Sequence, residues 1–204
     1  MGTIQRYTAK ERSNHWVVAI TFVLAALSGL ALFHPAFFFL TNLFGGGPWT
    51  RILHPFIGAV MFLSFMAMAA RFWRHNQITS ADRQWMGRIK DVLCNHDQSL
   101  PEVGKYNAGQ KYLFWIMVVS IPVLLISGIV IWQPWFAPFF PIGLTRLAVV
   151  VHALVAWIMI LGIIVHVYAA IWVKGSVRAM MRGTVSDAWA RHHHRAWYRD
   201  MMGK

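Results

Sequence analysis

Two histidines, His152 and His166, lie within an apolar stretch that runs from Val151 to Gly175. They are 14 residues apart. On a helix with a rise of about 1.5 Å per residue, this spacing separates them by roughly 21 Å and leaves both on the same face. Ionisable side chains at such a depth in a membrane are unfavourable and usually serve a function. The spacing therefore predicts one imidazole near each surface of a bilayer, although either histidine alone could simply be hydrogen-bonded to a neighbouring helix.

The rest of the chain supplies helices that can hold such imidazoles. Of its 204 residues, 57% are hydrophobic and 13% are charged, a composition typical of one membrane-embedded domain. The first apolar stretch lacks a small-residue cleavage site, so we expect a helix there and not a cleaved signal peptide. We expect a single all-α domain over residues 1–204, a bundle of four transmembrane helices at residues 16–33, 55–73, 112–132 and 147–173.

Positive charge is distributed unevenly along the chain. The net charge is +12, and 17 of the 19 Lys and Arg residues precede the first stretch, lie from Arg71 to Lys111, or follow the fourth stretch. Only Arg51 and Arg146 fall in the other two loops. The positive-inside rule therefore predicts a multi-pass membrane protein with both termini and the long middle loop in the cytoplasm. Since no soluble basic domain exists, we expect contacts with lipid headgroups and none with nucleic acid.

Two segments outside the apolar stretches are amphipathic. Residues 85–93 are typical of an interfacial helix whose apolar side faces the headgroups. The basic cytoplasmic tail, residues 174–204, carries Trp189, Trp197 and Tyr198 and is expected to lie on the inner membrane surface. For its histidine run, His192 to His194, we expect a solvated segment, with adventitious metal binding as the alternative.

Up-and-down packing of the four helices would sort the histidines into two pairs. His15 begins the first stretch at the cytoplasmic side, level with His166. His54 begins the second stretch at the outer side, level with His152. Imidazole is a nitrogen ligand suited to haem iron, whereas a zinc site requires three or four ligands at one place. The pattern thus predicts two haems. The chain has a single cysteine, Cys94, and no C-x-x-C-H motif, so these haems would not be covalently attached and the chain would hold no cysteine-ligated iron–sulfur cluster.

Several segments of the sequence resemble the cytochrome b556 (gamma) subunit of respiratory membrane-bound formate dehydrogenase. The similarity extends over nearly the whole chain, and the segments are specific as a set. The tail departs from the family pattern H-H-P-R-W-Y, with H-H-R-A-W-Y at residues 193–198. The matching segments are R-Y-T-A-K-E-R-S-N-H-W (6–16), R-I-L-H-P-F (51–56), V-G-K-Y-N-A-G-Q-K (103–111), I-W-Q-P-W-F-A-P (131–138) and H-V-Y-A-A-I-W-V-K-G (166–175).

The resemblance implies two b haems and assigns their axial ligands. His54 and His152 would ligate the outer haem iron, and His15 and His166 the inner one. It also implies a site for menaquinone or ubiquinone at Asn107, Gly109 and Gln110, with His166 close by. From the residues alone, the N-A-G-Q segment is ordinarily just a turn before a helix, although its amides could bind a quinone carbonyl.

The function implied by the resemblance is electron transport in anaerobic respiration. Electrons would pass from an iron–sulfur (beta) subunit at the outer face, through the two haems, to a quinone reduced near the cytoplasmic face. A molybdenum or tungsten (alpha) subunit would oxidise formate, so we expect no catalytic residue for that reaction here and a higher oligomer of the heterotrimer. The alternatives are the cytochrome b of a nickel–iron hydrogenase or thiosulfate-type reductase, and a haem-free transporter or scaffold.

Overall fold

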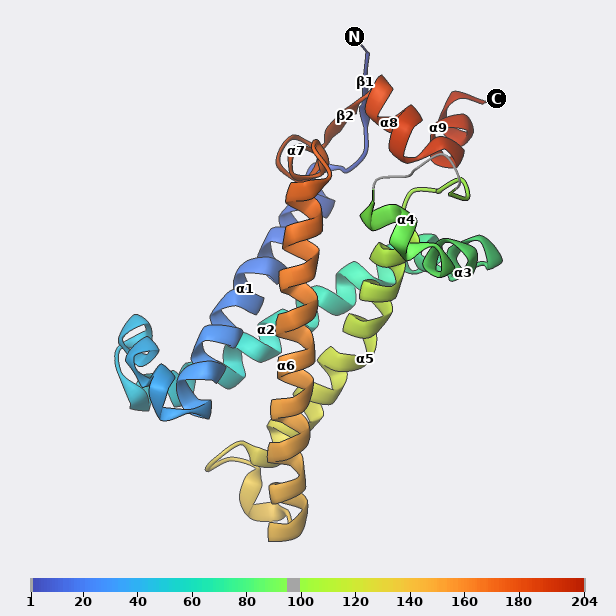
Figure 1. Cartoon of the computed structure of the whole chain (residues 1–204). Helices are drawn as coiled ribbons and strands as arrows, with labels where there is room; N and C mark the ends of the chain where they lie inside the picture. The colour runs from blue at the N-terminus through green and yellow to red at the C-terminus, as the bar shows by residue number, and fades with distance from the viewer. Residues whose placement is uncertain (1, 95–99, 204) are drawn as a thin grey trace. The chain divides into compact units, whose positions relative to one another are not determined.

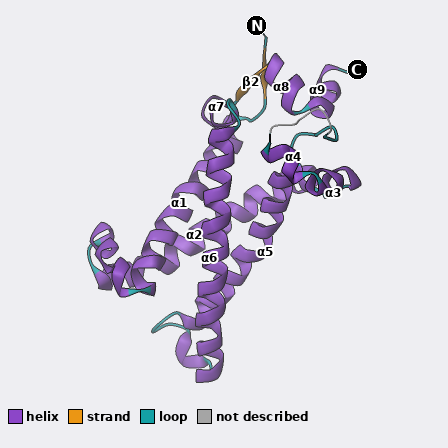
Figure 2. Ribbon diagram, in the orientation of Figure 1, coloured by secondary structure: helices purple, strands orange, loops and turns teal. Residues whose placement is uncertain are grey.

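Four long helices dominate the structure, a computed structural model that describes residues 2–94 and 100–203 (Figure 1). Each is long and apolar enough to cross a membrane, α2 together with the 3-10 turn η2 (Trp73–Asn76) that follows it. Apart from two short strands, the described elements are helical (Figure 2). The prediction of a four-helix membrane protein is therefore confirmed. The long helices are α1 (Ala9–Phe33), α2 (Gly47–Phe72), α5 (Ala108–Ile131) and α6 (Ile142–Trp172).

Each long helix begins before its apolar run, at residues 9, 47, 108 and 142 instead of 16, 55, 112 and 147. Polar capping residues explain two of these earlier starts. At α1, the backbone amide of Thr8 donates to Glu11 Oε2 over 2.7 Å, and the amide of Glu11 donates to Thr8 Oγ1 over 3.3 Å. Asn107 and Gln110 form the same reciprocal arrangement before α5. These capping boxes satisfy backbone donors at the helix start, so the helix extends beyond the apolar segment.

The chain divides into two compact units. The first, which we call the helix unit, comprises residues 13–69 and 117–164. The second, which we call the terminal unit, comprises residues 1–12, 70–116 and 165–204. The helix unit also contains the 3-10 helices η1 (Pro35–Phe44) and η4 (Ala137–Phe139), each in the loop between two long helices. Each unit is described by itself below.

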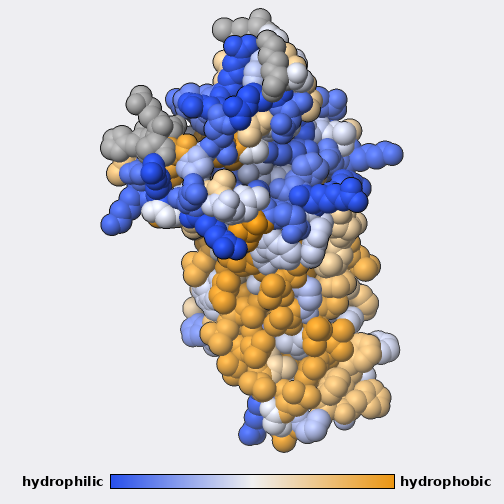
Figure 3. Space-filling view, turned by 90° about the vertical axis from the view of Figure 1, so that its right-hand side faces the viewer, coloured by the Kyte–Doolittle hydropathy of each residue, from blue (hydrophilic) through white to orange (hydrophobic). Residues whose placement is uncertain are grey.

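The helix unit exposes large apolar side chains along its helices. Leu63, Val119 and Leu161 are 67%, 62% and 58% exposed. The space-filling view shows apolar residues gathered over the surface of the long helices (Figure 3). A continuous apolar surface of this kind suits contact with lipid chains. The buried side chains of this unit include Phe65 and Met159, which are 0% and 2% exposed.

The terminal unit joins both ends of the chain in a small packed core. Strand β1 (Thr3–Gln5) pairs antiparallel with β2 (Thr184–Ser186), with Ile4 opposite Val185. Helices α7 (Ser176–Arg182) and α8 (Asp187–His193) contact these strands, and α9 (Arg195–Met202) packs on α8. The unit also contains the short helices α3 (Ser80–Gly87) and α4 (Ile89–Leu93). The buried members of the core are Tyr7, Tyr106, Ala179, Val185, Ala190 and Trp197.

Gly183 fixes the junction between the tail and the N-terminal segment. Its φ is +82°, a conformation that side chains with a Cβ rarely adopt. Its carbonyl accepts hydrogen bonds from the backbone amides of Arg6 and Tyr7, over 2.8 and 3.1 Å. A Cβ at this position would lie 2.6 Å from the Tyr7 carbonyl oxygen. The close approach of the two ends of the chain therefore requires glycine here.

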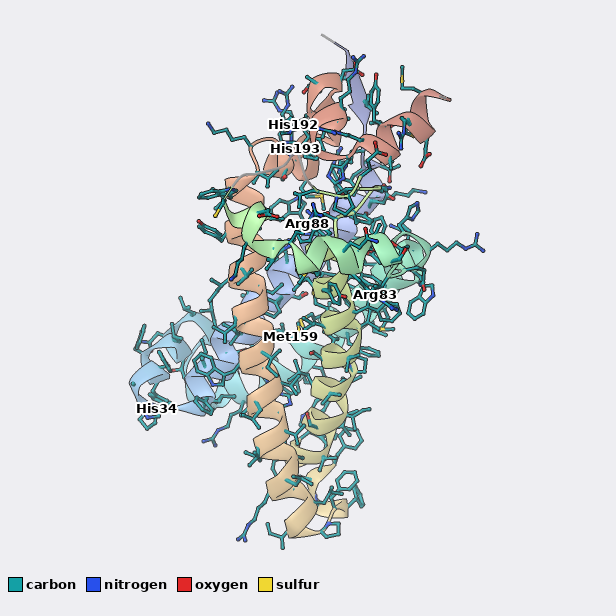
Figure 4. All side chains as sticks on the ribbon, turned by 45° about the vertical axis from the view of Figure 1, so that its right-hand side comes forward. His34, Arg83, Arg88, Met159, His192 and His193 are labelled. Carbon is teal, nitrogen blue, oxygen red and sulfur yellow. The ribbon has the colours of Figure 1, made fainter. Side chains whose placement is uncertain are left out.

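The terminal unit corrects the prediction that the histidine run of the tail is solvated throughout. Trp197 is only 8% exposed and His194 only 4%, so the tail is not a solvated surface segment at these positions. Trp85 is likewise only 8% exposed, whereas Ile89 of the same segment is 37% exposed. Trp197 packs in the same apolar core as Tyr7 and Tyr106, so hydrophobic burial holds this part of the tail against the other end of the chain. The two remaining members of the histidine run, His192 and His193, are labelled on α8 in Figure 4.

Candidate functional site

The helix unit brings His54 of α2 and His152 of α6 together. Their ring centres are 6.2 Å apart and their ring planes are inclined by 69°. Both side chains are half-buried. The two residues are 98 positions apart in the chain, and the packing of α2 near α6 is what makes them neighbours. This is the pair that the sequence predicted as ligands of the outer haem.

A serine orients each of these two imidazoles. Ser28 Oγ on α1 lies 2.9 Å from His54 Nδ1, and Ser127 Oγ on α5 lies 3.0 Å from His152 Nδ1. Each hydroxyl also lies 2.7 Å from the carbonyl oxygen four residues earlier in its own helix, that of Leu24 or Val123.

These distances assign the tautomer of both rings. A hydroxyl has one hydrogen, and a carbonyl can only accept, so each serine donates to the backbone of its own helix. The serine oxygen then accepts from the ring, which must carry its proton on Nδ1. A neutral ring protonated on Nδ1 has its lone pair on Nε2, the state that a metal-ligating histidine requires.

The separation of the rings also fits one metal ion between them. Metal–imidazole nitrogen bonds are about 2.0–2.1 Å long, so rings on opposite sides of one ion have centres roughly 6 Å apart. The observed separation is 6.2 Å. Across residues 2–94 and 100–203, no group of three or more His, Cys, Asp or Glu side chains is placed to hold a metal ion. The donor set thus fits two axial ligands of a haem iron and not a zinc site.

The two histidines of the second predicted pair belong to different units. His15 lies on α1 in the helix unit and His166 on α6 in the terminal unit, so their pairing stays a prediction. The neighbour of His15, Asn14, donates from Nδ2 to the Ser64 carbonyl of α2 over 2.9 Å. This bond joins α1 to α2 near His15. On α6, the buried Met159 lies seven residues from each histidine of that helix and is labelled in Figure 4.

The predicted quinone-binding residues form the capping box of α5. The Asn107 amide donates to Gln110 Oε1 over 3.0 Å, and the Gln110 amide donates to Asn107 Oδ1 over 2.9 Å. The box uses only the side-chain oxygens, so it leaves the NH2 donors of both amides for other partners. Gly109 is exposed, and a Cβ there would lie 3.8 Å from the Trp85 ring. The turn is therefore structural and also retains donors suited to a carbonyl ligand.

A buried ion pair at the same end of α5 was not predicted from the sequence. Lys111 Nζ donates to Asp82 Oδ2 over 2.7 Å and to the Gln77 carbonyl over 3.1 Å. Burial by itself would raise the pKa of Asp82, but hydrogen bonds from Lys111 and Thr79 outweigh it and lower that pKa. A cavity of about 50 Å³ adjoins the pair. The partners are 29 residues apart, a spacing that predicts no contact.

Arg6 and His194 form a second unpredicted network, in the core of the terminal unit. Arg6 Nη2 donates to the Lys105 carbonyl over 2.6 Å and to His194 Nε2 over 3.1 Å. Because a guanidinium only donates, His194 accepts on Nε2 and donates from Nδ1 to the Gly104 carbonyl, 2.7 Å away. Burial, followed by the Arg6 charge, lowers the pKa of His194 to about 3. The guanidinium carbon of Arg6 lies 4.9–5.5 Å from the centres of the Trp189, Trp197 and Tyr7 rings.

Comparison with known proteins identifies the family of this chain. The prokaryotic cytochrome b561 family matches residues 6–183. Over 199 residues the chain is 46% identical to the formate dehydrogenase cytochrome b556(fdo) subunit of Escherichia coli strain K12, covering 98% of this chain and 93% of that protein. The nitrate-inducible formate dehydrogenase cytochrome b556(Fdn) subunit of the same strain is 44% identical over 191 residues, covering 94% and 88%.

A more distant relative shows the same full-length similarity. The formate dehydrogenase cytochrome b556 subunit of Haemophilus influenzae is 38% identical over 197 residues, which are 97% of this chain and 83% of that protein. These matches confirm the resemblance found in the sequence motifs. The chain therefore belongs to the prokaryotic cytochrome b561 family and to the group of formate dehydrogenase cytochrome b556 subunits.

Proposed function

We propose that this chain is the membrane electron-transfer subunit of a formate dehydrogenase, embedded in the bacterial inner membrane as a single domain over residues 1–204. The observation that carries the proposal is the facing pair of His54 and His152, each with Nδ1 bound to a serine. A b haem with an imidazole on each side of its iron has no open coordination position, so it exchanges single electrons and binds no substrate at the metal.

His15 and His166 are the ligands that we propose for a second b haem. His166 lies 14 residues after His152 on the same helix, a distance of roughly 21 Å along the axis. Asn14 holds α1 against α2 beside His15 through its bond to the Ser64 carbonyl. One continuous helix, α6, would then contribute an axial ligand at each of two depths in the membrane.

The charge distribution supports a cytoplasmic location for both termini. With 17 of 19 basic residues in the N-terminal segment, the middle loop and the tail, the positive-inside rule places these segments in the cytoplasm. His54 and His152 then lie near the outer face. An electron that moves inward crosses the membrane field, at about 2.3 kcal/mol per 100 mV. The difference in potential between formate and quinone would have to supply that energy.

We place quinone reduction at the start of α5. Asn107 and Gln110 each retain an NH2 donor outside the capping box, and Gly109 leaves the turn open at its exposed side. Amide donors of this kind can hydrogen-bond a quinone carbonyl. His166, in the same terminal unit, is the fourth residue that we assign to the site.

The partners follow from the names of the relatives, which are subunits of formate dehydrogenases. We propose that this chain accepts electrons from an iron–sulfur (beta) subunit at the outer face. Through that subunit it would be connected to a molybdenum or tungsten (alpha) subunit that oxidises formate, in a higher oligomer of the heterotrimer. The single cysteine of this chain agrees with that division, because cysteine-ligated iron–sulfur clusters need several thiolates.

The test is to purify the complex and to measure its haem content and its electron donor. A pyridine haemochrome assay should give two b haems per chain, and formate should reduce both before a quinone analogue reoxidises them. Substitution His15→Ala should remove only one of the two haems. Reduction by hydrogen but not by formate would point instead to a hydrogenase cytochrome b. A complex without b haem would contradict the proposal and favour a haem-free transporter or scaffold protein.

A further inference from the structure

A Ser–Gly pair contacts each histidine of the outer-haem pair. Ser28 and Gly29 lie on α1, and their histidine lies 26 residues after the serine on α2. Ser127 and Gly128 lie on α5, and their histidine lies 25 residues after the serine on α6. The same contact is thus built twice, once in each of two helical hairpins within the helix unit.

The glycines leave room for the ring edges. A Cβ on Gly29 would lie 3.2 Å from His54 Cε1 and 3.8 Å from its Nδ1. A Cβ on Gly128 would lie 3.4 Å from His152 Cε1 and 3.7 Å from its Nδ1. Optimal contacts between carbon atoms are about 3.5–4.0 Å, so a methyl group on Gly29 would press on the His54 ring, whereas one on Gly128 would just touch the His152 ring. The serine binds one edge of the ring, and the adjacent glycine allows the ring to approach that closely.

We propose that the two Ser–Gly pairs are positioning elements that set the orientation and the basicity of the iron-binding nitrogens of His54 and His152. This inference rests on the proposed role of these two histidines as haem ligands. The serines do not touch the iron site themselves; they act through the imidazoles. Because both histidines have a serine hydroxyl as the partner of Nδ1, their Nε2 atoms should be similarly basic towards the iron.

The mechanism follows from the bonds of the serine hydroxyl. Its hydrogen is already donated to a backbone carbonyl over 2.7 Å, which polarises the oxygen and makes it a better acceptor. Accepting from Nδ1–H shifts electron density to Nε2 and raises the basicity of that nitrogen. A more basic ligand stabilises the oxidised state of a bound iron relative to the reduced state. Both serines would therefore lower the reduction potential of a haem held by His54 and His152.

The test uses the serine variants Ser28→Ala and Ser127→Ala in the complete complex. Each variant should raise the midpoint potential of one haem by up to about 59 mV. For a one-electron couple, this shift corresponds to a tenfold change in the ratio of the histidine's affinities for oxidised and reduced iron. The double variant should raise it by about twice the single shift. Electron paramagnetic resonance should show changed g-values for the same haem. Ser120→Ala, at a buried serine seven residues before Ser127 on α5, is the matched control and should shift neither quantity.

Substitutions of the two glycines test the steric part of the proposal independently of the serine variants. Gly29→Ala should reduce the content of the outer haem or broaden its resonance lines, because the added methyl group displaces the His54 ring, and Gly128→Ala should have a smaller effect of the same kind. Gly143→Ala is the control, since a Cβ at Gly143 has no neighbour within 4 Å among the described residues. Equal effects of the control and the two test variants would overturn the steric part of the proposal.

The outcomes separate this inference from the proposed function. Unchanged potentials and g-values in both serine variants, with both haems bound, would overturn the positioning role and leave the ligand assignment intact. If His54→Ala and His152→Ala retained both haems, the ligand assignment itself would fail. Where an alanine variant loses the haem, Ser28→Thr and Ser127→Thr decide the matter, because threonine keeps the hydroxyl. Retention of the haem by the threonine variants supports the proposal, and loss in both substitutions overturns it.

Discussion

The histidine pair of the helix unit and the single His194 of the terminal unit use the same tautomer for opposite purposes. In all three rings Nδ1 donates to an oxygen, from Ser28, Ser127 or the Gly104 carbonyl. The difference lies at Nε2. In His194 this nitrogen accepts from the Arg6 guanidinium, whereas in His54 and His152 the serine bonds at Nδ1 leave the Nε2 lone pair available.

The comparison shows that burial and a fixed tautomer do not by themselves make a histidine a ligand. His194 is the more buried of these histidines, yet a cation occupies the position that a metal would need. His54 and His152 have an uncharged partner at Nδ1 and a second imidazole at a separation that fits one ion. The available lone pair at Nε2, and not the depth of burial, distinguishes the proposed ligands from the structural histidine.

The largest expected effect is loss of cofactor. His54→Ala should remove one of two b haems completely, because a haem iron loses its axial ligand on that side. His194→Ala should keep both haems but lower the free energy of unfolding of the terminal unit by about 2 kcal/mol, since it leaves the Gly104 carbonyl and an Arg6 donor without this partner. Haem content and a thermal unfolding curve measure the two effects. Loss of haem from His194→Ala would break the distinction between the two regions.

The second prediction concerns pH and the stability of the terminal unit. The pKa of His194 is lowered from 6.5 to about 3, so between these values the unfolded chain binds more protons than the folded one. Stability must then rise with pH across this window. From pH 5 to pH 7 the gain from this group is about 2 kcal/mol. Protection of tail amides from hydrogen exchange at the two pH values should show it.

The variant His194→Asn provides the control for the pH prediction. Asparagine does not titrate and retains one amide donor for the Gly104 carbonyl. The pH dependence should become smaller by the amount assigned to His194. An unchanged slope in this variant would mean that another group produces it.

The smallest predicted effect concerns the side-chain amide of Gln110, which has one structural atom and one atom available to a ligand. Gln110→Glu keeps the oxygen that accepts from the Asn107 backbone amide but removes the NH2 donor. We expect the quinone KM to rise about fivefold, the equivalent of one hydrogen bond of ~1 kcal/mol, with unchanged thermal stability. Gln110→Ala, which also removes the capping bond, should affect both quantities. A normal quinone KM in Gln110→Glu would remove this residue from the proposed site.

The sequence alone determined the membrane class, the four helices and the identity of the candidate ligands. Apolar runs of sufficient length specify spans, and the 14-residue spacing of His152 and His166 specifies a shared helix face, because both follow from local geometry. The capping box of Thr8 and Glu11 is equally local, since its partners are only three residues apart. The family could be identified from short motifs for the same reason.

Only the tertiary structure decided which polar atoms meet across distant parts of the chain. The serine bound to each proposed outer ligand is 25 or 26 residues away on another helix, and Lys111 is 29 residues from Asp82. Arg6 and His194, predicted neither to be buried nor to meet, are 188 residues apart. Such contacts depend on how helices pack and which side chains face inward, and no local period in the sequence encodes them. The sequence therefore identified the candidate imidazoles, and the tertiary structure determined which partner each ring nitrogen has.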